Sequence, residues 1–324
     1  LLAPTLPMRG MFDHDPFSVG ISGGYARAIA REMGQQADLV VAFGASLTYY
    51  TVDGGKMYPN AKVVQVDMDP LGLRHGMKAA DLYLRADAKL AAIEATKAVR
   101  AKGGGKATVR TAELARRIRE EPADDAQFAI EPGTLDPRAV IDELDRVIPK
   151  DYDSVSGSGH QSYFHSVMRG RLPENFHAMR DFGAIGNGIS FAIGVASARQ
   201  NGKTVLFEGD GSLLMHIQEF EAIQRHGLKL LICVFNDGAY GSEIHKLRAD
   251  GIDDSGSVFG RTDLAAIAKG FGLRGNTITD LSQIKPLFEA YEKQGTAELW
   301  NVHVSDQVVN PGTRRLVKAG HGRM

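Results

Sequence analysis

The stretches TVLFEGDGS (204–212) and KLLICVFNDGAYG (229–241) decide the fold of this chain. Each starts as a short apolar run of strand length and ends in a polar turn that contains glycine. A helical pattern over 212–226 lies between them. Strand, helix and strand in this order predict two parallel strands joined by a right-handed crossover. Because ligands bind at the carboxyl ends of the strands in such sheets, we expect both turns to face one binding site.

The same alternation extends in both directions from these stretches. It predicts an α/β fold with two doubly wound parallel-sheet domains, at 1–100 and 135–324. A linker is predicted at 101–134, because this segment contains the glycine run KGGGK (102–106) and two prolines. Further strands are expected over 38–44, 62–67, 153–156 and 297–304, and helices over 24–37, 87–99, 111–121, 137–147, 186–199, 264–269 and 281–293.

The composition argues against several classes of protein. Among 324 residues, 38 Lys and Arg face 39 Asp and Glu, so the net charge of −1 gives no electrostatic reason to expect a nucleic acid or a membrane surface as partner. No apolar run approaches the ~18 residues that indicate a membrane span. The single cysteine, Cys233, excludes an internal disulfide and fits a reducing, cytoplasmic location. The chain starts with Leu1 and lacks a signal-peptide pattern, so we interpret it as beginning in mid-protein.

The two polar turns carry oxygen ligands of the kind that hard cations prefer. Asp210 offers a carboxylate, Asn236 an amide oxygen and Gly238 a backbone carbonyl. Three such oxygens without His or Cys favour Mg²⁺ or Ca²⁺ over zinc. A helix that starts near Ser212 would also direct backbone N–H groups at a phosphate. The pattern therefore predicts a diphosphate held through a divalent cation, although Asp210 as a helix cap and 236–238 as a simple turn is the alternative.

The spacing of these turns also resembles a known cofactor signature. Gly209-Asp210-Gly211, followed after residues 212–235 by Asn236-Asp237-Gly238, is similar to the signature of thiamine-diphosphate-dependent enzymes of the acetolactate synthase and benzoylformate decarboxylase group. The stretches DFGAIG (181–186), VDMDP (66–70) and 7–16 resemble the same group. The resemblance implies a partial central Rossmann-like domain and a diphosphate-binding domain, with the N-terminal pyrimidine domain missing.

The resemblance implies a role for each matching residue. Thiamine diphosphate and Mg²⁺ are the cofactors it implies, and it places the metal on Asp210, Asn236 and the Gly238 carbonyl. Ile185 would wedge between the two cofactor rings, with a buried core position as the alternative. Glu243 and His245 would face the substrate, unless they only begin an exposed helix. The remaining cofactor-binding residues would be Gly159, His160 (otherwise a solvated loop histidine), Gln161, Gly183, Gly209, Gly211, Ser212 and Tyr240.

The resemblance also implies an activity. We expect a lyase or transferase that decarboxylates 2-oxo acids or ligates them to a second carbonyl compound, such as an aldehyde, and a homodimer or homotetramer with the active site between subunits. The activating glutamate of the family lies in the missing N-terminal domain, so a non-catalytic or incomplete subunit that binds the diphosphate is the alternative. FAD is not expected, because GISGGY (20–25) departs from the flavin-binding pattern. A nicotinamide-dependent dehydrogenase is disfavoured, because no Gly-x-Gly-x-x-Gly follows the first strand of either domain.

Overall fold

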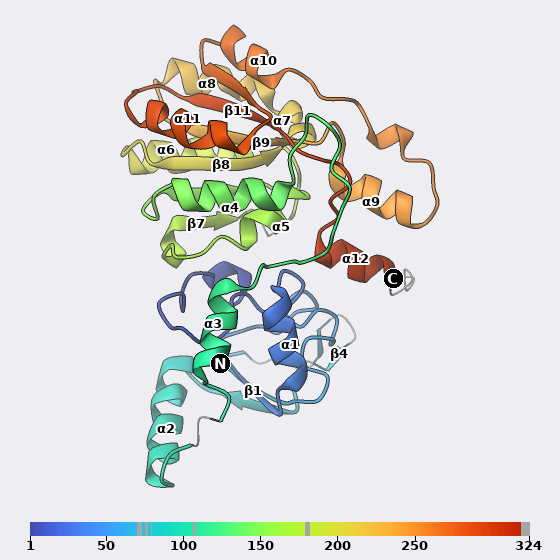
Figure 1. Cartoon of the computed structure of the whole chain (residues 1–324). Coiled ribbons are helices and arrows are strands. Elements are labelled where there is room, and N and C mark those ends of the chain that lie inside the picture. Colours follow the sequence, from blue (N-terminus) through green and yellow to red (C-terminus); the bar gives the residue numbers. More distant parts are fainter. Residues whose placement is uncertain (70–72, 75–76, 79, 106–107, 179–181, 319–324) are drawn as a thin grey trace. The chain divides into compact units, whose positions relative to one another are not determined.

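The computed structural model describes residues 1–69, 73–74, 77–78, 80–105, 108–178 and 182–318 (Figure 1). The chain divides into two compact units, Leu1–Asp125 and Ala126–Met324. Each unit has its own parallel sheet flanked by helices, so the predicted α/β fold with two parallel-sheet domains is confirmed. The domain limits at 100 and 135 stay a prediction.

The first unit is built on a three-stranded parallel sheet in the order β1-β2-β5. Its main core joins side chains of α1 and α3, such as Ile29 and Ile118, to Met57 in the loop between β1 and β2. Helix α3 lies within the predicted linker, yet it contributes to this core. The elements are η1 (Leu6–Met8), α1 (Ala28–Gln36), β1 (Leu39–Phe43), β2 (Lys62–Asp67), β3 (Leu73–Arg74), β4 (Met77–Lys78), β5 (Leu82–Arg85), α2 (Ala88–Ala101) and α3 (Ala112–Glu120).

The second unit is built on a six-stranded parallel sheet in the order β10-β11-β9-β8-β6-β7. The elements are α4 (Pro137–Val147), β6 (Asp153–Ser156), α5 (Gln161–Ser166), η2 (Pro173–Asn175), β7 (Phe176–Ala178), α6 (Gly188–Arg199), β8 (Thr204–Gly209), α7 (Asp210–Met215), η3 (Ile217–Glu219), α8 (Phe220–Arg225), β9 (Leu231–Asn236), α9 (Gly241–Ala249), η4 (Ser255–Ser257), α10 (Leu264–Gly270), β10 (Arg274–Ile278), η5 (Leu281–Gln283), α11 (Ile284–Glu292), β11 (Glu298–His303) and α12 (Pro311–Lys318).

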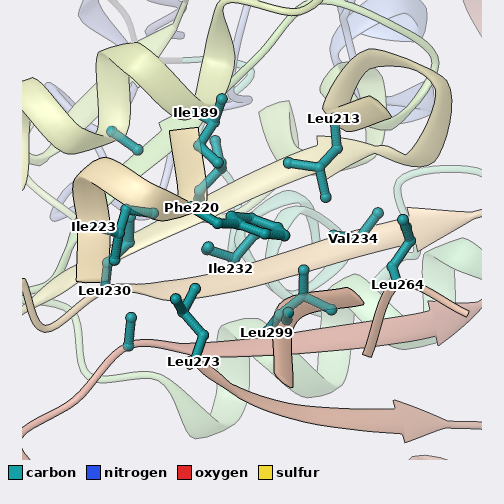
Figure 2. Close-up of a cluster of buried hydrophobic side chains, with 14 of the residues drawn as sticks. Ile189, Leu213, Phe220, Ile223, Leu230, Ile232, Val234, Leu264, Leu273 and Leu299 are labelled. Carbon is teal, nitrogen blue, oxygen red and sulfur yellow. The ribbon is translucent and has the colours of Figure 1, made fainter. Parts of the chain in front are cut away.

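The core of the second unit fixes β8 and β9 side by side. Figure 2 shows Phe220 of α8 among side chains from the sheet and from α6, including Ile189 and Ile232. All three side chains are fully buried or nearly so. Because β8 pairs with β9 in parallel register from Val205–Leu231 to Gly209–Phe235, both strands end at the same edge of the sheet. The packing therefore brings the two glycine-containing turns together, as predicted.

The single helix predicted over 212–226 is wrong. The chain forms α7, η3 and α8 instead, and α7 begins at Asp210 rather than near Ser212. The break lies at His216, which has the non-helical backbone angles φ −132° and ψ 32°. The ring of His216 forms a hydrogen bond of 2.6 Å between Nδ1 and the Gly186 carbonyl oxygen. This tertiary contact accompanies a change of helix direction that the local residue pattern does not predict.

Several short elements were not predicted. The strands β5, β7 and β10 are brief or rich in polar residues, and β10 contains Gly275 and Asn276. The helices α5, α9 and α12 span only six to nine residues each. Their sequences lack the long apolar period that identifies an element without knowledge of its neighbours.

Candidate active site

A cavity of about 290 Å³ opens at the carboxyl ends of β6, β8 and β9. Three segments line it: the loop 158–161 after β6, the turn 209–212 after β8, and residues 237 and 239–243 after β9, without Gly238. Ile185 and Ser305 also line it. This is the sheet edge at which parallel α/β folds bind their ligands.

Two carboxyl groups line this cavity, the buried Asp210 and the half-buried Asp237. Asp210 leaves only 1% of its surface exposed, and its Oδ2 accepts a hydrogen bond of 2.9 Å from the Gly238 backbone N–H. Burial raises the pKa of Asp210 to about 7. Burial, and then the neighbouring Asp210 carboxyl, raise the pKa of Asp237 well above its ordinary value. A bound cation would stabilise the charged forms of both carboxyl groups.

Asn236 and Gly238 are placed differently from the predicted metal ligands. The Asn236 side-chain N–H group donates to the Thr262 carbonyl at 3.0 Å and to Asn301 Oδ1 at 2.8 Å. Its Oδ1 is buried without a hydrogen-bond partner among the described residues, but Asn236 does not line the cavity. The Gly238 carbonyl accepts backbone N–H bonds from Phe259 and Gly260.

The physical reason for this difference is side-chain alternation. Asn236 is the last residue of β9, and its side chain points toward β11. Asp237 lies one residue further, beyond the strand, and turns into the cavity with Asp210. The structure thus brings Asp237, and not Asn236, into the cavity with Asp210. Ala239, two residues after Asp237, also lines the cavity.

The turn after β8 approaches the cavity closely because it is made of small residues. A Cβ atom at Gly211 would lie 2.7 Å from the ring of Tyr240, so only glycine fits. The Ser212 hydroxyl accepts a 2.7 Å hydrogen bond from the Gly186 backbone N–H. These contacts join the turn 209–212 to the segment before α6 and to the turn after β9.

The loop after β6 supplies His160 and Gln161. His160 Nε2 accepts a hydrogen bond of 3.2 Å from the Asn310 backbone N–H, which places the ring proton of the neutral form on Nδ1. Burial lowers the pKa of His160 well below its ordinary value, and the neighbouring His245 lowers it further. Gln161 Nε2 donates to Glu208 Oε1 at 3.2 Å. His160 is therefore half-buried, with its ring held by Asn310 and packed against His245, rather than a solvated loop histidine.

Comparison with known proteins assigns both units to one family. Residues 157–299 match the family model "Thiamine pyrophosphate enzyme, C-terminal TPP binding domain", and residues 2–96 match "Thiamine pyrophosphate enzyme, central domain". The chain belongs to the thiamine pyrophosphate enzyme family. The resemblance read from the two turns is confirmed at this level.

Several curated members of this family are similar to the chain at low identity. The "Probable acetolactate synthase large subunit" of Methanocaldococcus jannaschii is 24% identical over 99% of this chain and 54% of its own length. The "Acetolactate synthase large subunit" of Parasynechococcus marenigrum is 27% identical over 93% of this chain and 49% of its own length. The "3D-(3,5/4)-trihydroxycyclohexane-1,2-dione hydrolase 2" of Bacillus cereus is 23% identical over 92% of this chain and 52% of its own length. The chain thus spans about half the length of the curated relatives it matches.

The cavity fits the cofactor that the thiamine pyrophosphate enzyme family implies. The paired carboxyls of Asp210 and Asp237 suit a divalent cation with oxygen ligands. A Cβ atom at Gly241 would lie 2.3 Å from Asp237 Oδ2, so this turn also requires glycine. Among the described residues there is no group of three or more His, Cys, Asp or Glu that could hold a metal, so a cation here would need backbone or cofactor oxygens as well.

Other residues predicted from the family resemblance have varied positions. Ile185 lines the cavity and keeps 38% of its surface exposed, so it is not a core residue. Gly183 has a left-handed backbone with φ 71° and does not line the cavity. Asp181, the first residue of the DFGAIG stretch, lies outside the described residues, as does Pro70 of the VDMDP stretch.

Glu243 and His245 lie on α9, immediately after the turn that carries Asp237. Glu243 lines the cavity, and its Oε1 lies 2.8 Å from Lys246 Nζ. His245 does not line the cavity. It is buried, its ring centroid lies 4.6 Å from that of His160, and burial lowers its pKa to about 4. Of the two, only Glu243 can reach a molecule in the cavity without a rearrangement.

Three residues at or beside the cavity, Asp237, Ala239 and Glu208, are not among the predicted site residues. Asp237 directly follows the predicted Asn236 in the turn NDGAYG, and β9 extends one residue further than expected, to Asn236. Glu208 was passed over because it precedes the Gly-Asp-Gly turn on a buried strand. It is fully buried, and this burial raises its pKa to about 8.

In the part of the chain that the structure describes, no helix is long and apolar enough to cross a membrane.

Proposed function

We propose that this chain contributes the cofactor site of a thiamine-diphosphate- and Mg²⁺-dependent enzyme that decarboxylates or ligates 2-oxo acids. The observation that carries this proposal is a pair of carboxyls, the buried Asp210 and the half-buried Asp237, at the carboxyl ends of two adjacent strands in one cavity. The names of the acetolactate synthase relatives support the choice of 2-oxo acids as the substrate class.

Different residues of this chain would bind the cation, the diphosphate, the cofactor rings and the substrate. Asp210, Asp237 and the backbone around Ala239 would hold the cation. Gly211, Ser212 and the 159–161 loop would bind the diphosphate. When bound, thiamine diphosphate supplies a ring that accepts the electrons released as a bond next to a carbonyl breaks. Ile185, exposed in the cavity, would hold the cofactor in its bent form, and Glu243 would face the substrate.

The rest of the proposal concerns the assembly. A cytoplasmic homo-oligomer would place the site between subunits, with a carboxylate that activates the cofactor supplied from outside the residues of this chain. Sedimentation velocity measures the oligomeric state directly, and a monomer that still turns over substrate would contradict this part.

Cofactor binding is the decisive test. We expect Asp210→Asn and Asp237→Asn each to weaken thiamine diphosphate binding by at least about tenfold at fixed Mg²⁺, because each removes a charged oxygen from the cation site. Calorimetric titration with and without EDTA measures this effect. Asp253→Asn, which changes an exposed carboxylate, is the matched control. Equal affinities for wild type and all three variants would reject the proposed metal site.

A turnover assay separates the enzyme from the binding-only alternative. Release of CO₂ from pyruvate or a longer 2-oxo acid by the cofactor-loaded protein supports the enzyme. Tight cofactor binding without CO₂ release or carbon–carbon bond formation, tested over a panel of 2-oxo acids, supports the non-catalytic alternative.

A further inference from the structure

Glu208 occupies a position that the proposed function leaves unexplained. It is the next-to-last residue of β8, and its side chain is fully buried beside the cavity. Oε1 accepts hydrogen bonds of 3.2 Å from Gln161 Nε2 and from the Gly209 backbone N–H. Oε2 meets no hydrogen-bond geometry among the described residues, although the nearby Ser212 hydroxyl lowers the pKa of the carboxyl against the larger effect of burial. A buried carboxyl with one poorly satisfied oxygen is costly, so its presence in the fold calls for a structural reason.

Two glycines show where the second oxygen lies. A Cβ atom at Gly157 would come within 2.2 Å of Glu208 Oε2, and one at Gly188 within 1.8 Å. Neither glycine has a positive φ, so their backbone conformations would accept other residues. Both positions therefore require glycine because the Glu208 carboxyl fills the space that a side chain would need.

The carboxyl thereby touches three segments at once. Gly157 begins the loop after β6, which leads to Gln161 at the cavity. Gly188 begins α6, directly after the segment that carries Ile185. Gly209 begins the turn after β8 that carries Asp210. These are the segments assigned above to the diphosphate, the cofactor rings and the cation.

We propose that Glu208 is a positioning residue for the cofactor site. Its carboxyl sets the distance between the loop after β6 and the start of α6, and it orients the Gln161 amide toward the cavity edge. It does not touch the cofactor itself. The inference rests on the proposed function, since it assumes that the three segments bind thiamine diphosphate.

The first test compares two buried glutamates of the same sheet. Glu298, the first residue of β11, is 1% exposed, and its Oε1 accepts hydrogen bonds from Trp300 and Asn276. We expect Glu208→Ala to weaken thiamine diphosphate binding by about tenfold or more, the range found when a residue that supports ligands is lost. We expect Glu298→Ala to lower the melting temperature with affinity within about twofold of wild type, because it lies at the opposite end of the strands. Affinity is measured by calorimetry at saturating Mg²⁺.

A conservative variant tests whether shape and hydrogen bonding suffice. Glu208→Gln keeps both, so its affinity is expected to stay close to that of wild type. An affinity as low as that of Glu208→Ala would contradict the positioning role. If Glu208→Ala does not fold, Glu208→Asp, which withdraws the carboxyl by one methylene, takes its place in the comparison.

The second test uses the contact between Glu208 and Gly188. In wild type, Gly188→Ala forces a clash with the carboxyl and should weaken cofactor binding. In the Glu208→Ala background the space is open, so adding Gly188→Ala should have little further effect. Equal losses in both backgrounds, or a folded Glu208→Ala protein with wild-type affinity, would overturn the inference. A wild-type protein that binds no thiamine diphosphate would instead reject the proposed function.

Discussion

At the residue scale, three carboxyl groups with raised pKa values, Glu208, Asp210 and Asp237, make the stability of the protein sensitive to pH when no metal is present. In the unfolded chain Asp210 and Glu208 have ordinary pKa values of 3.8 and 4.5, whereas burial raises the pKa of Asp210 to about 7 and that of Glu208 to about 8. The pKa of Asp237 shifts in the same direction. The folded state therefore binds more protons than the unfolded state between these values.

This difference predicts a loss of stability as pH rises. With respect to these groups, the free energy of unfolding should be highest below about pH 4, where both states are protonated, and should fall toward pH 8, by up to about 1.4 kcal/mol per pH unit for each carboxyl. Urea unfolding in EDTA at pH 5, 6, 7 and 8 measures the slope. Mg²⁺ with thiamine diphosphate should reduce it, and Asp210→Asn should remove part of it. A metal-free protein that becomes steadily more stable from pH 5 to 8 would contradict this prediction.

A shift of one residue along a strand decides which side chain faces the cavity. Asp210 was placed correctly at the cavity because a Gly-Asp-Gly turn after an apolar strand has little freedom. The residue of the β9 turn that lines the cavity with Asp210 is Asp237, one position after the predicted Asn236, because successive side chains on a strand point to opposite faces. Whether Asn236 or Asp237 faces Asp210 depends on where pairing with β11 stops, and that end is fixed by the contact with Asn301.

At the element scale, α12 is joined to the cavity through one backbone group. The Asn310 N–H donates to His160 Nε2 at 3.2 Å, and the Asn310 side chain accepts a 2.9 Å hydrogen bond from the Thr313 backbone N–H at the start of α12. One residue thus orients the His160 ring and caps a helix. These two roles can be separated by substitution.

Asn310→Ala and Asn310→Pro separate them. Alanine removes the cap but keeps the N–H, so we expect a stability loss of about 1 kcal/mol with little change in cofactor affinity. Proline removes both, so the His160 ring loses its donor, and thiamine diphosphate should bind several-fold more weakly than to the alanine variant. Calorimetry and thermal melting on both variants measure the difference. If the two variants bind the cofactor equally well, the Asn310 backbone does not position His160.

Most of the strands that the sequence predicts contain an apolar run. β1, β2, β8, β9 and β11 are apolar runs between turn signals, and the sequence analysis predicts all of them to within a few residues. β10 is not predicted, because an edge strand with Gly275 and Asn276 depends on its pairing with β11 for its structure. The division of 210–225 into α7, η3 and α8 depends on the tertiary contact of His216 with Gly186.

At the scale of the whole molecule, each of the two units has its own hydrophobic core. Ile29 belongs to a core of the first unit, and Phe220 to the core of the second. The only tryptophan, Trp300, lies fully buried on β11 in the second unit. Its fluorescence therefore reports unfolding of the second unit, whereas circular dichroism reports helices of both.

This arrangement predicts that core mutations act on one unit at a time. Phe220→Ala should destabilise the second unit by about 3–5 kcal/mol, and Ile29→Ala should destabilise the first by about 2–5 kcal/mol, through lost burial and an unfilled cavity. In urea, Phe220→Ala should move the Trp300 fluorescence transition to lower concentration. Ile29→Ala should shift part of the circular dichroism change while the fluorescence midpoint stays near that of wild type. An equal shift of both signals by Ile29→Ala would show instead that the two cores unfold as one cooperative unit, and the cofactor site would then depend on the stability of both.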